Sequence, residues 1–289
     1  MIMKNKVCML ILSHGRADNV ITYKTLRKHG YTGDIKIIID DEDKQKDRYL
    51  EIYKNEVIIF SKSSYIGKID RMINEDVRNT VLFARNAIND LTENLDYNYF
   101  CELDDDYNYF GFRCAVGGKC KELKFPYLDE LFSYYVEFME NAKAVDCIAL
   151  AQGGDYIGGI DGSMFKKTVI RKVMNSFFFK KGNAPTFYGF MNDDTNLYIK
   201  SGNRGKIFFT PSGIMLHQAE TQQNKGGLTD MYLKYGTYIK PFLTVMLQPS
   251  SAKVYPLGNT RETNRLHHKI DWKRTVPQII REKHKKLEV

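Results

Sequence analysis

The chain has 289 residues, of which 43% are hydrophobic and 27% are charged, so it can bury a substantial core and is too apolar for extended disorder. Its apolar runs are strand-sized and far shorter than the roughly 20 residues that cross a bilayer, and we expect neither a membrane span nor a signal peptide. The net charge of +8 suits an anionic partner, and five cysteines without paired spacing indicate a reducing cytoplasm.

The first part of the chain alternates predicted strands and helices. The apolar run 7–12 predicts a buried strand, and 35–39 predicts a second one after a helix that stops at His29 and Gly30. This βαβ pattern makes the two strands parallel neighbours. A third strand is expected at 57–60, then a helix at 79–95 and a strand at 97–103.

The second part continues the same pattern with more glycine. A helix is expected from Pro126 to about Ala142, a strand at 147–151, a short helix from Asn192 and a strand at 207–210. Because the strands end in polar clusters, the pattern predicts an α/β fold. Its centre is a Rossmann-type, mostly parallel sheet flanked by helices, with the site at the strand carboxyl ends.

Three adjacent carboxylates, Asp104, Asp105 and Asp106, come directly after the strand at 97–103. Such crowding costs folding energy through like-charge repulsion unless a cation neutralises it. Carboxylate oxygens suit Mn²⁺ or Mg²⁺, and the ion would in turn bind a diphosphate. The triplet therefore predicts a divalent-metal site, with a solvated acidic turn as the structural alternative.

A second acidic pair, Asp193 and Asp194, would lie at the N-terminus of the helix that begins near Asn192. Capping by Asn192 or Asp193 explains one acid and does not require two. An acceptor hydroxyl that attacks an anomeric carbon must lose its proton, and a positioned carboxylate is the usual base. We therefore expect a catalytic base in this pair, with Asp194 slightly favoured over Asp193.

Other polar residues are candidates to bind a nucleotide. The loop that begins at Ser13 carries Arg16, whose guanidinium matches phosphate geometry, and Arg85 offers the same group or a structural ion pair on its helix. Asp40 ends the second strand. There its carboxylate would accept the imide hydrogen of uracil, with a solvated acidic loop as the alternative.

Three further candidates lie in the second part of the chain. Gly159 belongs to a glycine-rich segment that lets the backbone approach a sugar closely or forms only a turn. Lys225 lies in a polar, glycine-rich stretch suited to phosphate. His217 would complete the coordination shell that Asp106 begins, or is a hydrogen-bonded loop residue.

The segments ILSHGRADNVITYKTLRKHGYTGDIKIIIDDED, ARNA and ELDDDYNYFGFR together resemble the TET-associated glycosyltransferase family, whose members are phage-encoded. The resemblance implies a GT-A fold and transfer from a UDP-sugar onto hydroxymethylated DNA bases, usually 5-hydroxymethylcytosine, in the host cytoplasm. By this resemblance Asp104 and Asp106 match the metal and donor motif, Asp40 and Arg85 match donor-side positions, and His217 matches a histidine metal ligand.

This interpretation gives a GT-A domain over residues 1–250, with a nucleotide-sugar and metal half at 1–115 and an acceptor half at 116–250. A basic C-terminal segment follows at 251–289. DNA suits a basic protein with an acidic centre, because lysines and arginines bind phosphates while aspartates hold metal. The residues in the C-terminal segment that would grip DNA, unless it is a solvated tail, are Lys269, Lys273, Arg274 and Arg281.

Two rival functions remain open from the sequence. One is a glycosyltransferase that acts on a glycan or another non-DNA acceptor. The other is a non-catalytic DNA-binding module on a GT-A scaffold. The intact triplet of aspartates argues against the second rival, because a binding module has no need of crowded acids.

Overall fold

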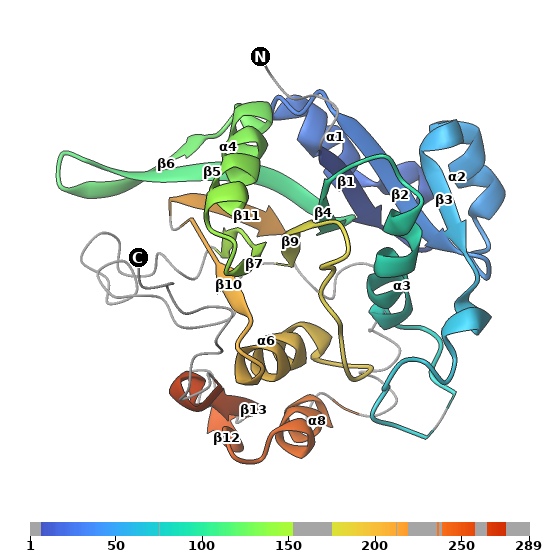
Figure 1. Cartoon of the computed structure of the whole chain (residues 1–289), viewed down its shortest axis with the longest axis vertical. Coiled ribbons are helices and arrows are strands. Elements are labelled where there is room, and N and C mark those ends of the chain that lie inside the picture. The colour runs from blue at the N-terminus through green and yellow to red at the C-terminus, as the bar shows by residue number, and fades with distance from the viewer. Residues whose placement is uncertain are drawn as a thin grey trace, which may run out of the picture.

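The computed structural model describes residues 7–74, 76–152, 175–211, 213–218, 236, 239–257 and 265–275. Its centre is a seven-stranded sheet with the order β10-β7-β9-β4-β1-β2-β3 (Figure 1). The strands of this sheet are β1 (Val7–Leu12), β2 (Asp34–Asp40), β3 (Val57–Phe60), β4 (Tyr99–Asp104), β7 (Val145–Ile148), β9 (Ser176–Lys180) and β10 (Ile207–Phe209). β9 is antiparallel to β4 and β7, and the other pairs are parallel. The predicted α/β class with a mostly parallel sheet is confirmed.

Helices cover both faces of this sheet, because alternate side chains of each strand point to opposite faces. The face that carries Val7, Met9 and Ile11 packs against α1, α2 and α4, and the face that carries Leu10 and Leu12 packs against α3 and α6. The helices are α1 (Ile21–Lys28), α2 (Lys46–Tyr53), α3 (Leu82–Glu93), α4 (Leu128–Asn141), α6 (Asp193–Asn203) and α8 (Ile239–Leu247). The short 3-10 turns are η1 (Ala17–Asn19), η2 (Lys54–Glu56), η3 (Lys62–Tyr65) and η6 (Trp272–Thr275).

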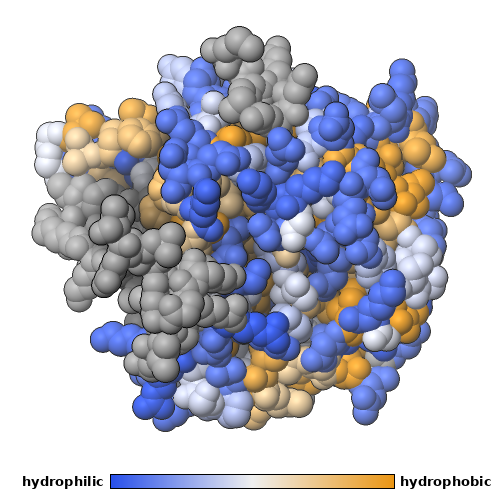
Figure 2. Space-filling view, in the orientation of Figure 1, coloured by the Kyte–Doolittle hydropathy of each residue, from blue (hydrophilic) through white to orange (hydrophobic). Residues whose placement is uncertain are grey.

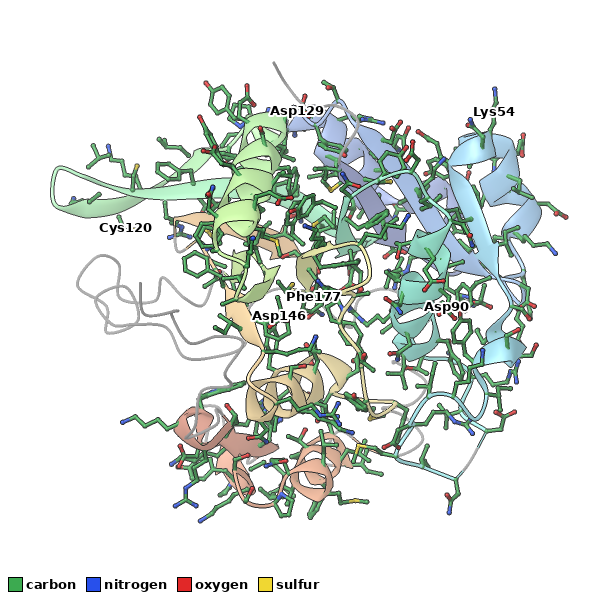
Figure 3. The ribbon with its side chains drawn as sticks, in the orientation of Figure 1. Lys54, Asp90, Cys120, Asp129, Asp146 and Phe177 are labelled. Atoms are coloured by element: carbon green, nitrogen blue, oxygen red, sulfur yellow. The ribbon has the colours of Figure 1, made fainter. Side chains whose placement is uncertain are left out.

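β9 explains much of the high aromatic content. Its Phe177, Phe178 and Phe179 are fully buried, and Phe177 lies deep inside the molecule (Figure 3). Phe178 stacks on Tyr99 and Phe132 on one face, while Phe177 contacts α6 on the other. Each such side chain contributes about 1.5–3 kcal/mol of burial free energy, so β9 fastens helices on both faces.

A second, four-stranded sheet lies beside the first, with the order β6-β5-β11-β8. Its strands are β5 (Tyr107–Val116), β6 (Lys119–Lys124), β8 (Ala151–Gln152) and β11 (Ile214–Gln218). The single strand predicted at 147–151 is therefore split between two sheets, because the chain leaves β7 after Ile148 and pairs again at Ala151. The boundary expected between residues 115 and 116 falls inside β5.

The described part of the basic C-terminal segment is folded onto the body. β12 (Ala252–Leu257) and β13 (Arg265–Ile270) form an antiparallel hairpin that packs on α8, and η6 packs on α6. Arg281 lies outside the described residues. Within the described ranges no helix has both the length and the hydropathy needed to span a bilayer.

Candidate active site

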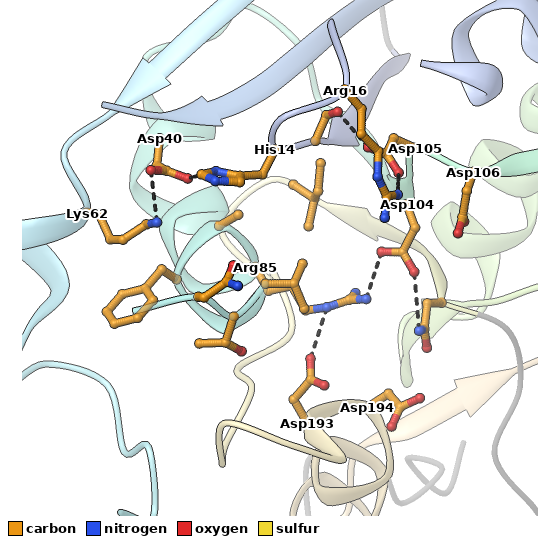
Figure 4. A pocket seen from close by; sticks show the side chains of 18 of the residues that line it. His14, Arg16, Asp40, Lys62, Arg85, Asp104, Asp105, Asp106, Asp193 and Asp194 are labelled. Carbon is orange, nitrogen blue, oxygen red and sulfur yellow. Dashed lines mark hydrogen bonds and ion pairs between the residues drawn. The ribbon is translucent and has the colours of Figure 1, made fainter. Parts of the chain in front are cut away.

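The carboxyl ends of β1, β2, β3 and β4 open onto one cavity of about 360 Å³ (Figure 4). Small-molecule sites usually measure about 300–1,000 Å³, and in open α/β sheets they lie at this edge. The opposite wall comes from α3 and from the start of α6. The predicted site residues that line the cavity are Ser13, Arg16, Asp40, Arg85, Asp104, Asp105, Asp106, Asp193 and Asp194.

Asp105, the middle acid of the triplet, is held inside the protein. It is 5% exposed, and Arg16 Nη1 lies 2.6 Å from one carboxylate oxygen while Ser13 Oγ donates to the other at 2.6 Å. Burial raises the pKa of Asp105, although Arg16 and Ser13 oppose that shift. Tyr49 completes the cluster because its hydroxyl bonds to Ser13 Oγ and accepts from the Arg16 backbone amide. Asp105 therefore anchors the loop after β1.

Arg85 is the electrostatic centre of the site. It is 2% exposed, and its guanidinium forms ion pairs with Glu102 at 2.6 Å, Asp104 at 2.8 Å and Asp193 at 3.0 Å. Burial raises the pKa of Glu102 to about 8, although Arg85 opposes the shift. One guanidinium thus joins β4, which carries the acidic triplet, to α6, which carries the second acidic pair.

Asp104 and Asp106 differ in their partners. Both oxygens of Asp104 are engaged, by Arg85 on one side and by Tyr107 and Asn175 on the other. Asp106 accepts hydrogen bonds from Gln218, and no basic side chain of the described ranges pairs with it. Burial and the neighbouring Asp104 and Asp105 raise the pKa of Asp106 to about 6. Among the described residues this carboxylate therefore has no basic ion-pair partner.

The donor set fits a hard divalent cation that shares its shell with a ligand. Among the described residues, no three His, Cys, Asp or Glu side chains are grouped so that they would hold an ion by themselves. Mg²⁺ typically takes one or two carboxylates and completes its shell with phosphates and water. Asp104 and Asp106 suit such an ion, which would neutralise the charge on Asp106.

Asp40 is the centre of a second polar cluster, at the end of β2. Its carboxylate bonds to His14 Nδ1 at 2.7 Å and to the buried Lys62 Nζ at 2.9 Å. Burial favours the neutral acid, yet these two partners lower the pKa of Asp40. The hydrogen bond from Asp40 in turn raises the pKa of His14. His14 and Lys62 also line the cavity, and the sequence analysis assigned neither.

The second acidic pair lies in the first turn of α6. Asp193 and Asp194 are 7% and 8% exposed, and Asp194 accepts the Thr195 amide at 2.6 Å. Asn192 does not cap the helix with its side chain. It adopts φ 61°, and its amide donates to Thr244 Oγ1 at 2.6 Å and bonds to His268 Nδ1 at 2.9 Å. The acidic pair is therefore tied to α8 and β13.

A family model for the TET-associated glycosyltransferases matches residues 7–227. The chain belongs to this family. The predicted family, and with it the prediction of a glycosyltransferase enzyme, are confirmed. A comparison with curated proteins found no match.

Similar solved structures include glucosyl-3-phosphoglycerate synthase from Mycobacterium tuberculosis. Its complex with Mg²⁺ and UDP shows 6% identity and a TM-score of 0.45 over 92% of this chain and 88% of that one. Its complex with Mn²⁺, UDP-glucose and phosphoglyceric acid shows 7% identity and a TM-score of 0.46 over 95% and 88%. CMP:2-keto-3-deoxy-manno-octonic acid synthetase with CTP matches at 8% identity and 0.29 over 51% and 52%.

One predicted metal ligand of this glycosyltransferase is not brought to the cavity. His217 lies within β11 rather than in a loop, and its Nε2 bonds to Glu122 of β6 at 2.6 Å. The neighbouring Gln218 lines the cavity and contacts Asp106 instead. The structure therefore does not bring His217 to the cavity that Asp106 lines, and a shared ion stays a prediction. Gly159 and Lys225, predicted to bind the donor, lie outside the described residues.

Proposed function

We propose that this glycosyltransferase uses a UDP-sugar and Mn²⁺ or Mg²⁺, and transfers the sugar to the hydroxymethyl group of 5-hydroxymethylcytosine or a similar base in DNA. The observation that carries the proposal is that strand-end carboxylates and α6 carboxylates line one cavity. These two groups of carboxylates, which Arg85 joins, supply what the reaction needs: a site for the diphosphate with its cation and a base for the acceptor.

On the donor side we assign the cation to Asp104 and Asp106, where it would offset charge on the departing diphosphate. Arg16 lines the cavity next to them and adds a guanidinium suited to phosphate. We assign the nucleobase to the Asp40 cluster, because Asp40, His14 and Lys62 supply both hydrogen-bond acceptors and donors at the end of β2.

On the acceptor side we assign the base to Asp194. Asp193 forms an ion pair with the Arg85 guanidinium at 3.0 Å, which disfavours its protonation, and Asp194 lines the cavity beside it. The acceptor hydroxyl oxygen forms a bond to the anomeric carbon, the bond from that carbon to the diphosphate oxygen breaks, and the hydroxyl proton passes to Asp194. UDP leaves with the bonding electron pair.

DNA as the acceptor is supported by charge. The protein carries a net charge of +8, and Lys253 and Lys269 stand beside Tyr255 on the exposed face of the β12–β13 hairpin. The inner face of that hairpin reaches Asn192 next to the proposed base. A base in a duplex must be flipped out to enter a catalytic pocket. A basic surface next to that pocket would hold the duplex by its phosphates.

The test incubates the protein with hydroxymethylcytosine DNA, Mn²⁺ and a panel of UDP-sugars, then weighs the digested nucleosides. We expect one donor to add its glycosyl mass, Asp106→Ala to abolish that gain, and Glu93→Ala, on the exposed end of α3, to keep it. UDP release without modified DNA would favour a glycan or other acceptor. DNA binding without use of any donor would favour the binding module.

A further inference from the structure

The β5–β6 hairpin projects from the body of the molecule as a long ribbon (Figure 1). Gly117 and Gly118 close it with φ of 58° and 73°, so this two-residue turn needs positive φ at both positions, which glycine adopts without strain. β5 begins at Tyr107, directly after Asp106. The ribbon is therefore rooted at the candidate active site and extends away from it.

One face of this ribbon combines basic and apolar side chains. The register pairs Phe112 with Leu123 and Val116 with Lys119, and it places Lys121 between these pairs on the same face. The three apolar side chains are 38%, 50% and 44% exposed, and both lysines are exposed. In the described ranges neither lysine has an acidic partner. Figure 2 shows hydrophilic and apolar residues mixed on this projection.

On the opposite face of the ribbon, ion pairs engage its one acidic side chain. Between residues 107 and 124 the only acid is Glu122, which pairs with Arg113 at 2.5 Å and with His217 at 2.6 Å partway along the ribbon. The same span holds four basic residues, Arg113, Lys119, Lys121 and Lys124. The ribbon therefore carries a net charge of +3, and its tip carries unneutralised lysines.

We propose that the β5–β6 hairpin is a contact for duplex DNA, about one helical turn away from the modified base. The inference rests on the proposed function, since it takes DNA as the acceptor. A two-stranded ribbon fits the major groove, where apolar side chains contact base methyl groups. Lysines at the ribbon's edge reach phosphates.

The length of the ribbon sets the position of the contact. The ten residues of β5 advance roughly 3.3 Å each, which places the turn about 30 Å from Asp106. One turn of B-DNA spans about 34–36 Å, or about 10 base pairs. We consider a duplex that runs along the ribbon while its flipped base enters the cavity. This duplex meets Lys119 and Lys121 about one helical turn from the flipped base. On one side of the modified base, this contact requires a flank of about ten base pairs.

The first experiment measures duplex binding by fluorescence anisotropy without a donor. Lys121→Glu should weaken the Kd by at least about fivefold and reduce the slope of log K against log salt by about one. The matched control is Lys54→Glu, an exposed charge reversal on the opposite side of the molecule from the ribbon (Figure 3). It should bind DNA like the wild type. Equal affinities of the two variants would overturn the inference.

The second experiment shortens the DNA flank. The binding defect of Lys121→Glu should appear on duplexes with about 15 base pairs on each side of the modified base. It should vanish when the flank that contacts the hairpin is shortened to about 4 base pairs. A defect that persists unchanged on the short duplex would also refute the inference. Its failure is separable from that of the proposed function. If sugar is transferred to DNA but Lys121→Glu binds DNA normally, only the hairpin contact is refuted. If Lys121→Glu weakens DNA binding but no sugar is transferred, only the proposed activity is refuted.

Discussion

Replacing Arg85 by Met should cost about 3–5 kcal/mol of unfolding free energy. Removing one partner of a buried ion pair leaves an uncompensated charge, which usually costs about 3–5 kcal/mol. Here the guanidinium is 2% exposed and faces Glu102, Asp104 and Asp193, so its removal exposes three carboxylates to one another. The effect belongs at the upper end of the range. Met retains an unbranched apolar stem, so lost packing contributes little.

The assay is equilibrium urea unfolding followed by the fluorescence of Trp272, the single tryptophan, which packs against the cluster beneath α3 and α6. The control is Arg48→Met, because Arg48 forms ion pairs on the surface of α2 and its loss should change the midpoint little. Adding Glu102→Gln to Arg85→Met should restore part of the stability by removing one acid. If Arg85→Met unfolds at the wild-type urea concentration, Arg85 is not the counter-ion of these carboxylates.

Three further predictions concern individual residues. The pKa of Asp106 is raised to about 6, so Mn²⁺ affinity in the presence of UDP should fall as pH drops from about 7 to about 5, and calorimetry should show a weaker dependence in Asp106→Asn, where the UDP phosphate still titrates. The pKa of His14 is raised by its hydrogen bond to Asp40, so its stabilising contribution is complete below about pH 6.5 and is lost as pH rises through the raised value. His14→Ala should therefore destabilise the fold more at about pH 6 than at about pH 9 in urea titrations. Asn192 adopts a positive φ, so Asn192→Ala should lose more stability and transfer rate than Asn192→Gly, and equal losses would show that backbone strain there is unimportant.

The sequence located the strand ends well because continuous apolar runs followed by polar residues identify buried parallel strands. β1, β2, β3 and β4 each end where the cavity begins, which is why side chains distant in the chain, such as Arg16 and Asp194, line it together. The buried position of Arg85 is also indicated by the sequence. Arg85 lies three residues after Leu82 and three before Ile88, so helical spacing places it on the buried face of α3.

Features that depend on antiparallel pairing were not predicted from the sequence. The pair Gly117 and Gly118, followed by the alternation of Lys119, Cys120 and Lys121, is a hairpin signal. His217 was expected to bind metal because its spacing after a strand suited a ligand, but the side of a strand that a residue faces depends on register. Pairing of β11 with β5 turns His217 toward Glu122 and brings Gln218 to Asp106.

The acidic triplet itself shows why adjacency in sequence does not imply a shared role. Crowding alone would make the three carboxylates equal candidates for a cation. Within the protein, however, Arg16 pairs with Asp105, and Arg85 pairs with Asp104 as well as with Glu102 and Asp193. Only the charge of Asp106 has no such partner in the described ranges, so the need for an external cation concentrates there. An ion with few protein ligands and a shell completed by the donor diphosphate follows from this division. Metal and nucleotide should therefore bind together, each strengthening the other.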